Sequence, residues 1–200
     1  MSITYPLSMP AGDPGVKDLV LTANYVVAQS VSPYTSQEQV YQHSGSWWEL
    51  TSNFAPMKRP DAENWIAFLL SLRGRAGTFL FGDPSAVNPQ GNAGGSPIVS
   101  GAGQTGGSLL ITGLTGTIEA GDYFAIGSGS TQRLYKNLTD QSGSPCTLDI
   151  FPFIRESPAA NAPLTLVNAQ GVFRLTENAQ PWSVDEAMHY QLNFKAREAF

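Results

Sequence analysis

Hydrophobic positions in residues 47–83 follow the period of a helix and then that of a strand. Four apolar side chains have the i, i+3, i+4, i+7 spacing of one helix face: Trp65, Phe68, Leu69 and Leu72. Pro60 suits a first helical position, because its missing N–H would be unpaired there. Gly74 can adopt the left-handed conformation that ends a helix. The pattern therefore predicts a helix over residues 60–73.

Two further apolar residues, Ile66 and Leu70, widen the predicted apolar face of this helix. A wide apolar face is expected where a helix lies against a sheet. After the glycine, residues 78–81 form a short apolar run that ends at Gly82 and predicts a strand. Residues 47–83 therefore predict a strand, a helix, a turn and a second strand.

The residues before this helix show strand patterns. Residues 17–30 alternate partly and predict one strand, or two strands broken near Asn24. Residues 38–42 and 46–50 predict two more short strands, joined through residues 43–45. Trp47 and Trp48 are adjacent, so in a strand they point to opposite faces, and one of them is expected in the core.

The pattern changes after Asp83. Residues 84–107 are rich in Gly, Pro, Ser and Asn, and predict a linker that carries one short apolar island at Ile98 and Val99. Short strands separated by turns at intervals of roughly 8–12 residues then follow, as in a small sandwich or barrel. Residues 188–194 alternate clearly and predict an amphipathic strand.

These patterns predict a mainly β protein in two parts. Residues 1–83 and 171–200 are expected to form one β domain that carries the helix. Residues 84–170 are expected to be a small β-sandwich or barrel inserted into it, because insertions are tolerated at exposed loop tips. The first 15 residues, with three prolines, are either a frayed terminus or an arm that docks on a neighbouring molecule.

Composition narrows the function classes. Only 14% of the residues are charged, below the roughly 25% usual in soluble domains. The net charge is −5 without a basic run, which disfavours phosphate-mediated binding of nucleic acid. No apolar run is long enough to span a bilayer. The first residues lack the features of a signal peptide, and Cys146 is the single cysteine, so we expect no internal disulfide and synthesis in the cytosol.

Motifs with catalytic chemistry are weak. Residues 101–106 match G-x-G-x-x-G, but a β-like run follows where a dinucleotide site needs a helix, so we interpret the motif as a loop. His43 and His189 lie in unrelated strands, which predicts no metal site. Cys146 is expected to pack as a small apolar residue. No catalytic residue, cofactor or metal is predicted.

The carboxylates that could form a catalytic pair mostly occupy turn positions, where Asp serves the local backbone: Asp83, Asp122, Asp149, Glu156, Asp185 and Glu186. Exposed aromatic residues indicate contact with another protein rather than catalysis, because aromatics are enriched at protein interfaces. Trp182, beside Pro181 in a predicted loop, is the best candidate for such a contact.

A series of residues across 45–180 resembles the tail-tip proteins of long-tailed bacteriophages, and within them the distal tail protein family. The first part of the series is Trp48, Arg59-Pro60, Trp65, Leu72-Arg73-Gly74, Gly77-Thr78-Phe79 and Gly82-Asp83-Pro84. The second part is Gly121-Asp122, Gln132, Leu134-Tyr135, Pro152, Arg155 and Phe173-Arg174-Leu175.

The resemblance implies a belt-like β-sandwich with one helix, and a second β domain outside it. It further implies a non-enzymatic, hexameric ring that joins the tail tube protein to the tip hub or baseplate of the virion, after assembly in the cytoplasm of the host bacterium. Each contact in such a ring is head to tail. We expect sheet edges to form these contacts, through Val40, Tyr41, Tyr190 and Leu192, together with Trp182 and the first 15 residues.

Two alternatives stay open at the level of sequence. The first is a carbohydrate-binding module that attaches the tail to glycans of the host surface through the inserted domain. The second is a tail-associated glycan hydrolase with a carboxylate pair, for which Asp122 and Asp149 are the candidates.

Overall fold

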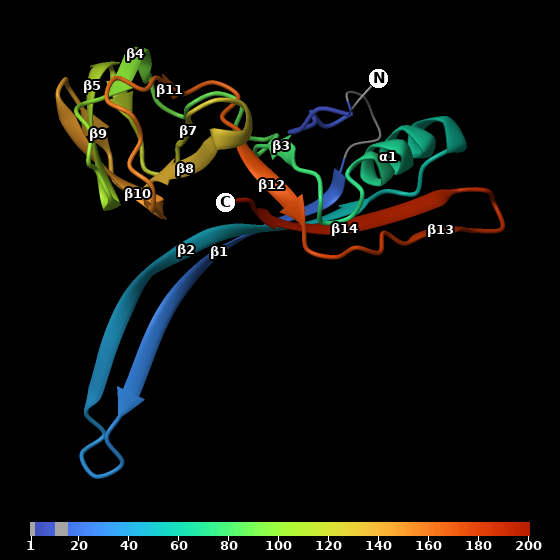
Figure 1. Cartoon of the computed structure of the whole chain (residues 1–200), viewed down its shortest axis with the longest axis horizontal. Coiled ribbons are helices and arrows are strands. Elements are labelled where there is room, and N and C mark those ends of the chain that lie inside the picture. The colour runs from blue at the N-terminus through green and yellow to red at the C-terminus, as the bar shows by residue number, and fades with distance from the viewer. Residues whose placement is uncertain (1–2, 11–15) are drawn as a thin grey trace.

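The computed structural model describes residues 3–10 and 16–200. It confirms a mainly β fold, with 49% of the residues in strands and 8% in helical conformation. Two antiparallel sheets lie next to each other, and a long two-stranded hairpin projects away from both (Figure 1). Among the described residues there is one α-helix, α1 (Arg59–Ser71).

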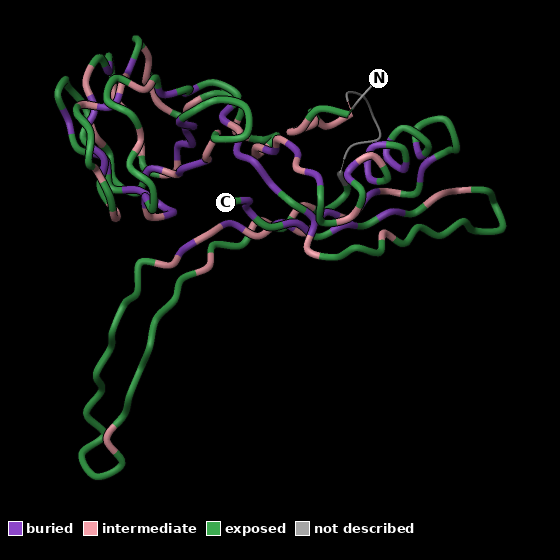
Figure 2. The backbone as a smooth tube through the Cα atoms, in the orientation of Figure 1, coloured by how far each residue is buried: buried purple, intermediate pink, exposed green. Residues whose placement is uncertain are grey.

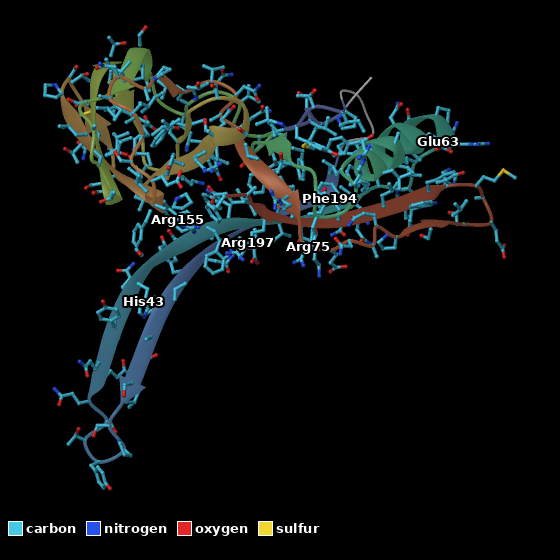
Figure 3. The ribbon with its side chains drawn as sticks, viewed as in Figure 1. His43, Glu63, Arg75, Arg155, Phe194 and Arg197 are labelled. Carbon is cyan, nitrogen blue, oxygen red and sulfur yellow. The ribbon has the colours of Figure 1, made fainter. Side chains whose placement is uncertain are left out.

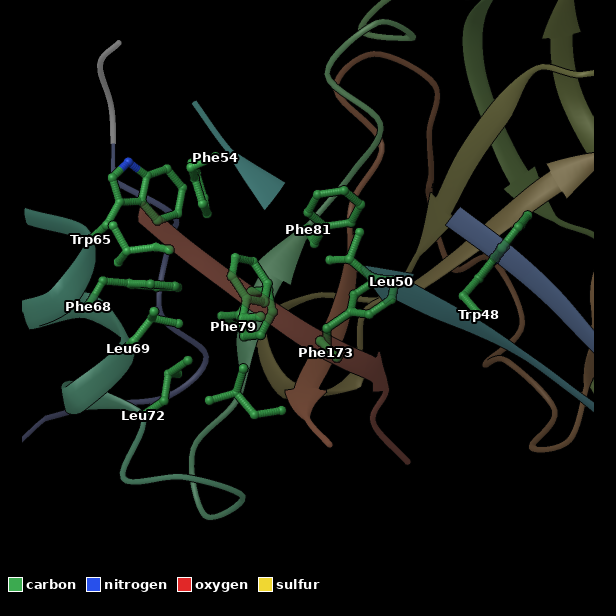
Figure 4. Packing of buried hydrophobic residues seen from close by; sticks show 14 of the residues in the cluster. Trp48, Leu50, Phe54, Trp65, Phe68, Leu69, Leu72, Phe79, Phe81 and Phe173 are labelled. Carbon is green, nitrogen blue, oxygen red and sulfur yellow. The ribbon is translucent and has the colours of Figure 1, made fainter. Parts of the chain in front are cut away.

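The first sheet carries the helix. Its strands pair in the order β1-β2-β14-β12-β3, and β13 pairs with the start of β14. The strand bounds are β1 Val16–Val31, β2 Glu38–Phe54, β3 Phe79–Phe81, β12 Gly171–Leu175, β13 Trp182–Val184 and β14 Tyr190–Glu198. Aromatic rings join the helix to this sheet, because Trp65 lies 4.5 Å from Phe54 and Phe68 lies 5.7 Å from Phe79, measured between ring centroids (Figure 4).

The apolar face predicted for the helix is confirmed with one exception. Trp65, Phe68, Leu69 and Leu72 are all buried, as is Ile66. Leu70 was expected to widen this face, but its side chain is 57% exposed. The reason is the helical rotation of about 100° per residue, which turns position 70 away from the sheet.

Before the helix, the first of the two alternatives for residues 17–30, a single strand, is confirmed, whereas the prediction of two short strands in residues 38–50 is wrong. Residues 17–30 form part of a single strand, β1, and residues 38–50 form part of a single strand, β2. The two strands pair along almost their whole length, and the pairing shifts register between Tyr25 and Val27. This irregularity accommodates the turn-forming residues near Gly45, which the sequence pattern indicated as a connection between two strands.

The second sheet curves into a nearly closed barrel. Its strands pair in the order β11-β7-β8-β10-β5-β4, and a bridge between Ile98 and Pro163 brings its first and last parts together. The strand bounds are β4 Gly94–Val99, β5 Gly106–Thr115, β7 Tyr123–Ile126, β8 Arg133–Asn137, β10 Cys146–Ile154 and β11 Leu164–Thr165. Two smaller strands, β6 (Thr117–Ile118) and β9 (Gln141–Ser142), pair separately, and η1 (Gly129–Thr131) is a short 3-10 turn.

The interpretation of residues 84–107 as a linker is wrong for its central part. β4 occupies residues 94–99 and pairs with β5. Gly95 has a φ of +85°, and a Cβ there would lie 2.6 Å from the carbonyl oxygen of Gly113. Glycine is therefore required by a close approach within the sheet rather than by a flexible segment. The division into an outer and an inserted domain stays a prediction.

The two sheets share a hydrophobic core. Along β7, Phe124 and Ile126 point into the barrel, whereas Tyr123 and Ala125 belong to the cluster of the first sheet. Phe151 of β10 also packs in that cluster, against Trp48, with ring centroids 4.6 Å apart. These strands of the second sheet are therefore covered on both faces.

The start of the chain lies along the edge strand of the first sheet. Leu7 forms a parallel bridge with Phe79, and the hydroxyl of Tyr5 donates a hydrogen bond of 2.7 Å to the carbonyl oxygen of Ser71. Residues 3–10 thus cover part of their own fold, which neither of the two expectations for this segment described. The remainder of the expected arm, residues 1–2 and 11–15, lies outside the described residues.

Neighbouring leucines of α1 provide a test of its buried face. Leu69→Ala is expected to lower the free energy of unfolding by about 2–5 kcal/mol, because the substitution leaves a cavity under the helix. Leu70→Ala changes an exposed position and is expected to alter this free energy by less than about 0.5 kcal/mol. Urea unfolding followed by tryptophan fluorescence measures both, and equal losses would contradict the orientation of the helix.

Candidate functional site: the projecting hairpin

The outer half of the β1–β2 hairpin has no other described part of the chain beside it. β14 pairs with β2 only over residues 49–53, so beyond this point each strand of the hairpin has the other as its single strand neighbour among the described residues. The exposed colour covers nearly all of this segment in Figure 2. A two-stranded ribbon of this kind is only marginally stable in water by itself. We therefore expect a ribbon of this length to be covered by a partner.

The hairpin displays apolar side chains on both faces. Residues paired across the strands point to the same side, and the pairs Val27 with Gln42 and Gln29 with Val40 alternate with Ala28 and Tyr41. Val40 and Tyr41 are 60% and 64% exposed, and Tyr34 stands at the tip. The exposure of Val40 and Tyr41 agrees with their predicted place at an open sheet edge.

The hairpin is almost free of charge. In residues 24–47, Glu38 is the single residue with a formal charge at pH 7 when histidine is neutral. Natural proteins commonly protect open strand edges with charged side chains, which oppose pairing with another strand. This hairpin lacks such protection, and it combines open edges with exposed apolar groups. These are the properties of a surface that becomes covered.

The root of the hairpin, in contrast, is fixed to the second sheet. Ser46 is completely buried, and its Oγ accepts a hydrogen bond of 2.7 Å from the backbone N–H of Phe153. Arg155 donates to the carbonyl oxygen of Ser46, and the ring of Tyr25 packs against Phe151 at 4.8 Å. Figure 3 shows Arg155 between the second sheet and the hairpin. These contacts set the direction in which the hairpin projects.

A buried carboxylate belongs to the same root. Glu198 of β14 is 5% exposed, and its Oε2 accepts a hydrogen bond of 3.3 Å from the backbone N–H of Trp48. Burial raises the pKa of Glu198 from 4.5 to about 7, although this hydrogen bond and the nearby Arg133, Arg155 and Arg197 lower it. The sequence contained a signal for this position, because Glu198 continues the buried alternation of Leu192, Phe194 and Ala196.

The two adjacent tryptophans lie as their alternation predicts. Trp48 is buried, and its Nε1 donates a hydrogen bond of 3.2 Å to the carbonyl oxygen of Leu134. Trp47 points to the other face of β2, where the guanidinium of Arg197 lies 4.2 Å from the centroid of its ring.

Two other predicted interface residues are not at a free edge. β14 lies inside the first sheet, and its segment from Tyr190 to Leu192 pairs with β13. Tyr190 also bridges to Met57, and Leu192 is only 3% exposed. The expected edge at these two residues is therefore wrong, because β13 covers it. Trp182 is half-exposed in β13, which pairs only with β14 among the described residues and so presents an open edge there.

The weak catalytic motifs have structural explanations. The glycine motif of residues 101–106 forms a loop that leads directly into β5, so no helix follows it. Cys146 is buried, and burial raises the pKa of its thiol. Asp122 is buried and accepts a backbone hydrogen bond from Glu119 within its own turn, as expected, and a second one from the distant Gln90. Asp149 accepts a hydrogen bond from the hydroxyl of Thr139.

The histidines stand in separate surroundings. His43 packs against Tyr41 on the hairpin, whereas the backbone N–H of His189 donates to the carboxylate of Asp185. In the described part of the chain, no three His, Cys, Asp or Glu side chains gather as a metal site would require. No helix there combines the length and apolar character needed to cross a membrane.

Comparison of the chain with protein-family models and with curated proteins finds no match.

The raised pKa of Glu198 predicts a pH-dependent stability. The folded protein binds a proton at this carboxyl more readily than the unfolded chain does, so stability falls as the pH rises from 4.5 through about 7. Glu198→Gln is expected to remove this contribution, about 3 kcal/mol between pH 4 and pH 8. Urea unfolding at several pH values measures the difference between variant and wild type.

The matched control for this experiment is Glu186→Gln, which changes an exposed carboxyl and should retain the pH dependence of the wild type. Parallel pH profiles for wild type and Glu198→Gln would show that the buried carboxyl does not cause the dependence.

Proposed function

We propose that the protein is a non-enzymatic structural component of a bacteriophage tail tip, and that it forms a ring that joins the tail tube to the tip hub or baseplate. The supporting observation is the exposed, nearly uncharged β1–β2 hairpin, whose open edges and apolar side chains need a partner. The ring form and the number of six subunits are expectations that follow from the resemblance to distal tail proteins.

A second copy of the chain is the partner that fits best. The hairpin and β13 lie at opposite ends of the molecule (Figure 1), so a contact between them joins different surfaces of successive subunits. Such a head-to-tail contact closes into a ring when the rotation between subunits allows it. β13 offers an open edge with the half-exposed side chains of Trp182 and Val184, to which a strand of the hairpin can add.

The remaining partners are part of the same proposal. The faces of the ring would contact the tail tube protein on one side and the tail hub protein on the other, in a virion assembled in the cytoplasm of the host. No cofactor is needed for this role. Contacts between neutral surfaces also avoid the cost of removing charged groups from water.

Charges placed on the hairpin test the contact between subunits. We expect Val27→Asp combined with Val40→Asp to weaken self-association by about 100-fold or more, because two carboxylates would be buried without partners. Native mass spectrometry and light scattering measure the subunit number, and negative-stain images show whether a ring is present. The folded monomer should be as stable as before, since both positions are exposed.

The matched control is Val167→Asp, which makes the same change at an exposed valine outside the hairpin and should leave assembly unchanged. A wild-type protein that stays monomeric at high concentration, or a double variant that assembles normally, would contradict the proposed contact.

The opposite end of the subunit has its own test. Trp182→Ala is expected to weaken association by about 10-fold, because large aromatic side chains contribute strongly at interfaces. Sedimentation velocity over a series of concentrations measures the change. Unchanged association would remove β13 from the contact while leaving the hairpin in it.

A further inference from the structure

A cavity of about 380 Å³ lies at the seam between the second sheet and the end of β14. Its size is within the range of about 300–1,000 Å³ that is usual for small-molecule sites. Apolar side chains of Ile126, Pro152, Phe153 and Phe200 form part of its wall. The cavity is separate from the exposed faces of the hairpin, so an inference about its ligand does not depend on ring formation.

Two side chains that are buried overall carry polar groups in the wall of the cavity. Tyr135 is 7% exposed, and within residues 3–10 and 16–200 its hydroxyl makes no hydrogen bond. Glu198 uses its Oε2 to accept from Trp48, and neither ion pair of the described residues involves it. A ligand that displaces water from these groups has to offer hydrogen-bond partners in its place. The wall therefore favours a polar ligand over a purely apolar one.

The charges around the cavity balance at a pH above about 7, where Glu198 is ionised. Arg133 and Arg155 line it together with Glu156 and Glu198, so the formal charges sum to zero when both carboxyls are ionised. Arg155 is already engaged, because it donates to the carbonyl oxygen of Ser46 and its guanidinium lies 3.6 Å from the centroid of the Phe200 ring. Arg133 reaches two backbone carbonyl oxygens through Nη1 only, at 3.3 and 3.4 Å. A balanced cavity does not favour a ligand with several like charges.

We propose that this cavity binds a neutral polyhydroxylated ligand of monosaccharide size. A hydroxyl both donates and accepts, so adjacent hydroxyls of one sugar ring can donate to Glu198 and accept from Arg133. The hydroxyl of Tyr135 can bond a third group of the ligand. The rings of Phe153 and Phe200 supply apolar surface for the C–H face of the sugar.

The test uses the 200-residue chain at pH 8, where Glu198 is ionised, and four sugars. Saturation-transfer NMR is recorded with glucose, galactose, N-acetylglucosamine and N-acetylgalactosamine, each at about 10 mM, a concentration that detects millimolar dissociation constants. We expect transfer to at least one of them. Tyr135→Phe should weaken its binding by about 3- to 10-fold, and Glu198→Gln by about 10-fold or more, since hydrogen bonds to charged groups contribute more.

Matched controls separate this site from effects on the fold. Tyr34→Phe and Glu186→Gln make the same chemical changes at exposed positions and should bind sugar like the wild type. Urea unfolding shows that Tyr135→Phe and Glu198→Gln are folded under the conditions of the NMR experiment.

Three results would overturn the proposal. The first is the absence of transfer to all four sugars. The second is transfer that persists unchanged in both cavity variants, which would place the binding elsewhere. The third is binding of acetate or phosphate that depends on Arg133 without any binding of sugar, which would make the cavity an anion site.

Discussion

The layer of side chains between the two sheets is the constraint on which the rest of the structure depends. Three residues of the second sheet point their side chains away from the barrel and pack in the core of the first sheet, beside Trp48: Tyr123, Ala125 and Phe151. A sheet that is buried on both faces cannot be separated from its neighbour without exposing apolar surface on each side. The barrel and the helix-bearing sheet are therefore joined by packing as well as by the chain. Trp48, in the middle of β2, is common to this layer and to the hairpin.

This layer also determines what the hairpin can do. The ribbon leaves the core at Ser46, where hydrogen bonds from Phe153 and Arg155 hold its backbone against the second sheet. Its outer half is exposed, but its direction is set at the root. A surface held in a defined direction loses less conformational freedom when it binds than a free loop would. Glu198 of β14 accepts a hydrogen bond from Trp48 at this root and also lines the cavity, so the two candidate sites share the layer that fixes them.

The sequence allowed the fold class and the helix to be predicted, because both depend on local periodicity. Trp65, Phe68 and Leu69 repeat with the helical period and are buried as expected. The length of β2 could not be predicted in this way, since residues 43–45 carry turn signals and only pairing with β1 keeps them extended. The same holds for β4, where Gly95 is explained by the close approach of β5. At these positions, contacts with neighbouring strands determine the backbone conformation more than local sequence preference does.

The candidate sites differ in how far the sequence indicates them. Val40 and Tyr41 were expected at an edge and are exposed there, whereas Leu192 was expected at an edge that β13 covers. Strand alternation places Leu192 and Glu198 on the same face, so the burial of one predicts the burial of the other. A buried carboxylate at the end of such a series is expensive unless it has a partner or a ligand. This cost in free energy is a physical reason to expect a binding role for Glu198.

The charged residues of the chain, already few, are distributed unevenly along it. At the average of 14%, residues 24–47 would carry about three charged side chains, but they carry one. These residues also form two exposed strand edges, where a protein that remains monomeric would be expected to place lysines or other charges against unwanted pairing. Charge is therefore scarce at the position where it would protect a monomer most. A sequence with this distribution is suited to a hairpin that another protein surface covers in the assembled state.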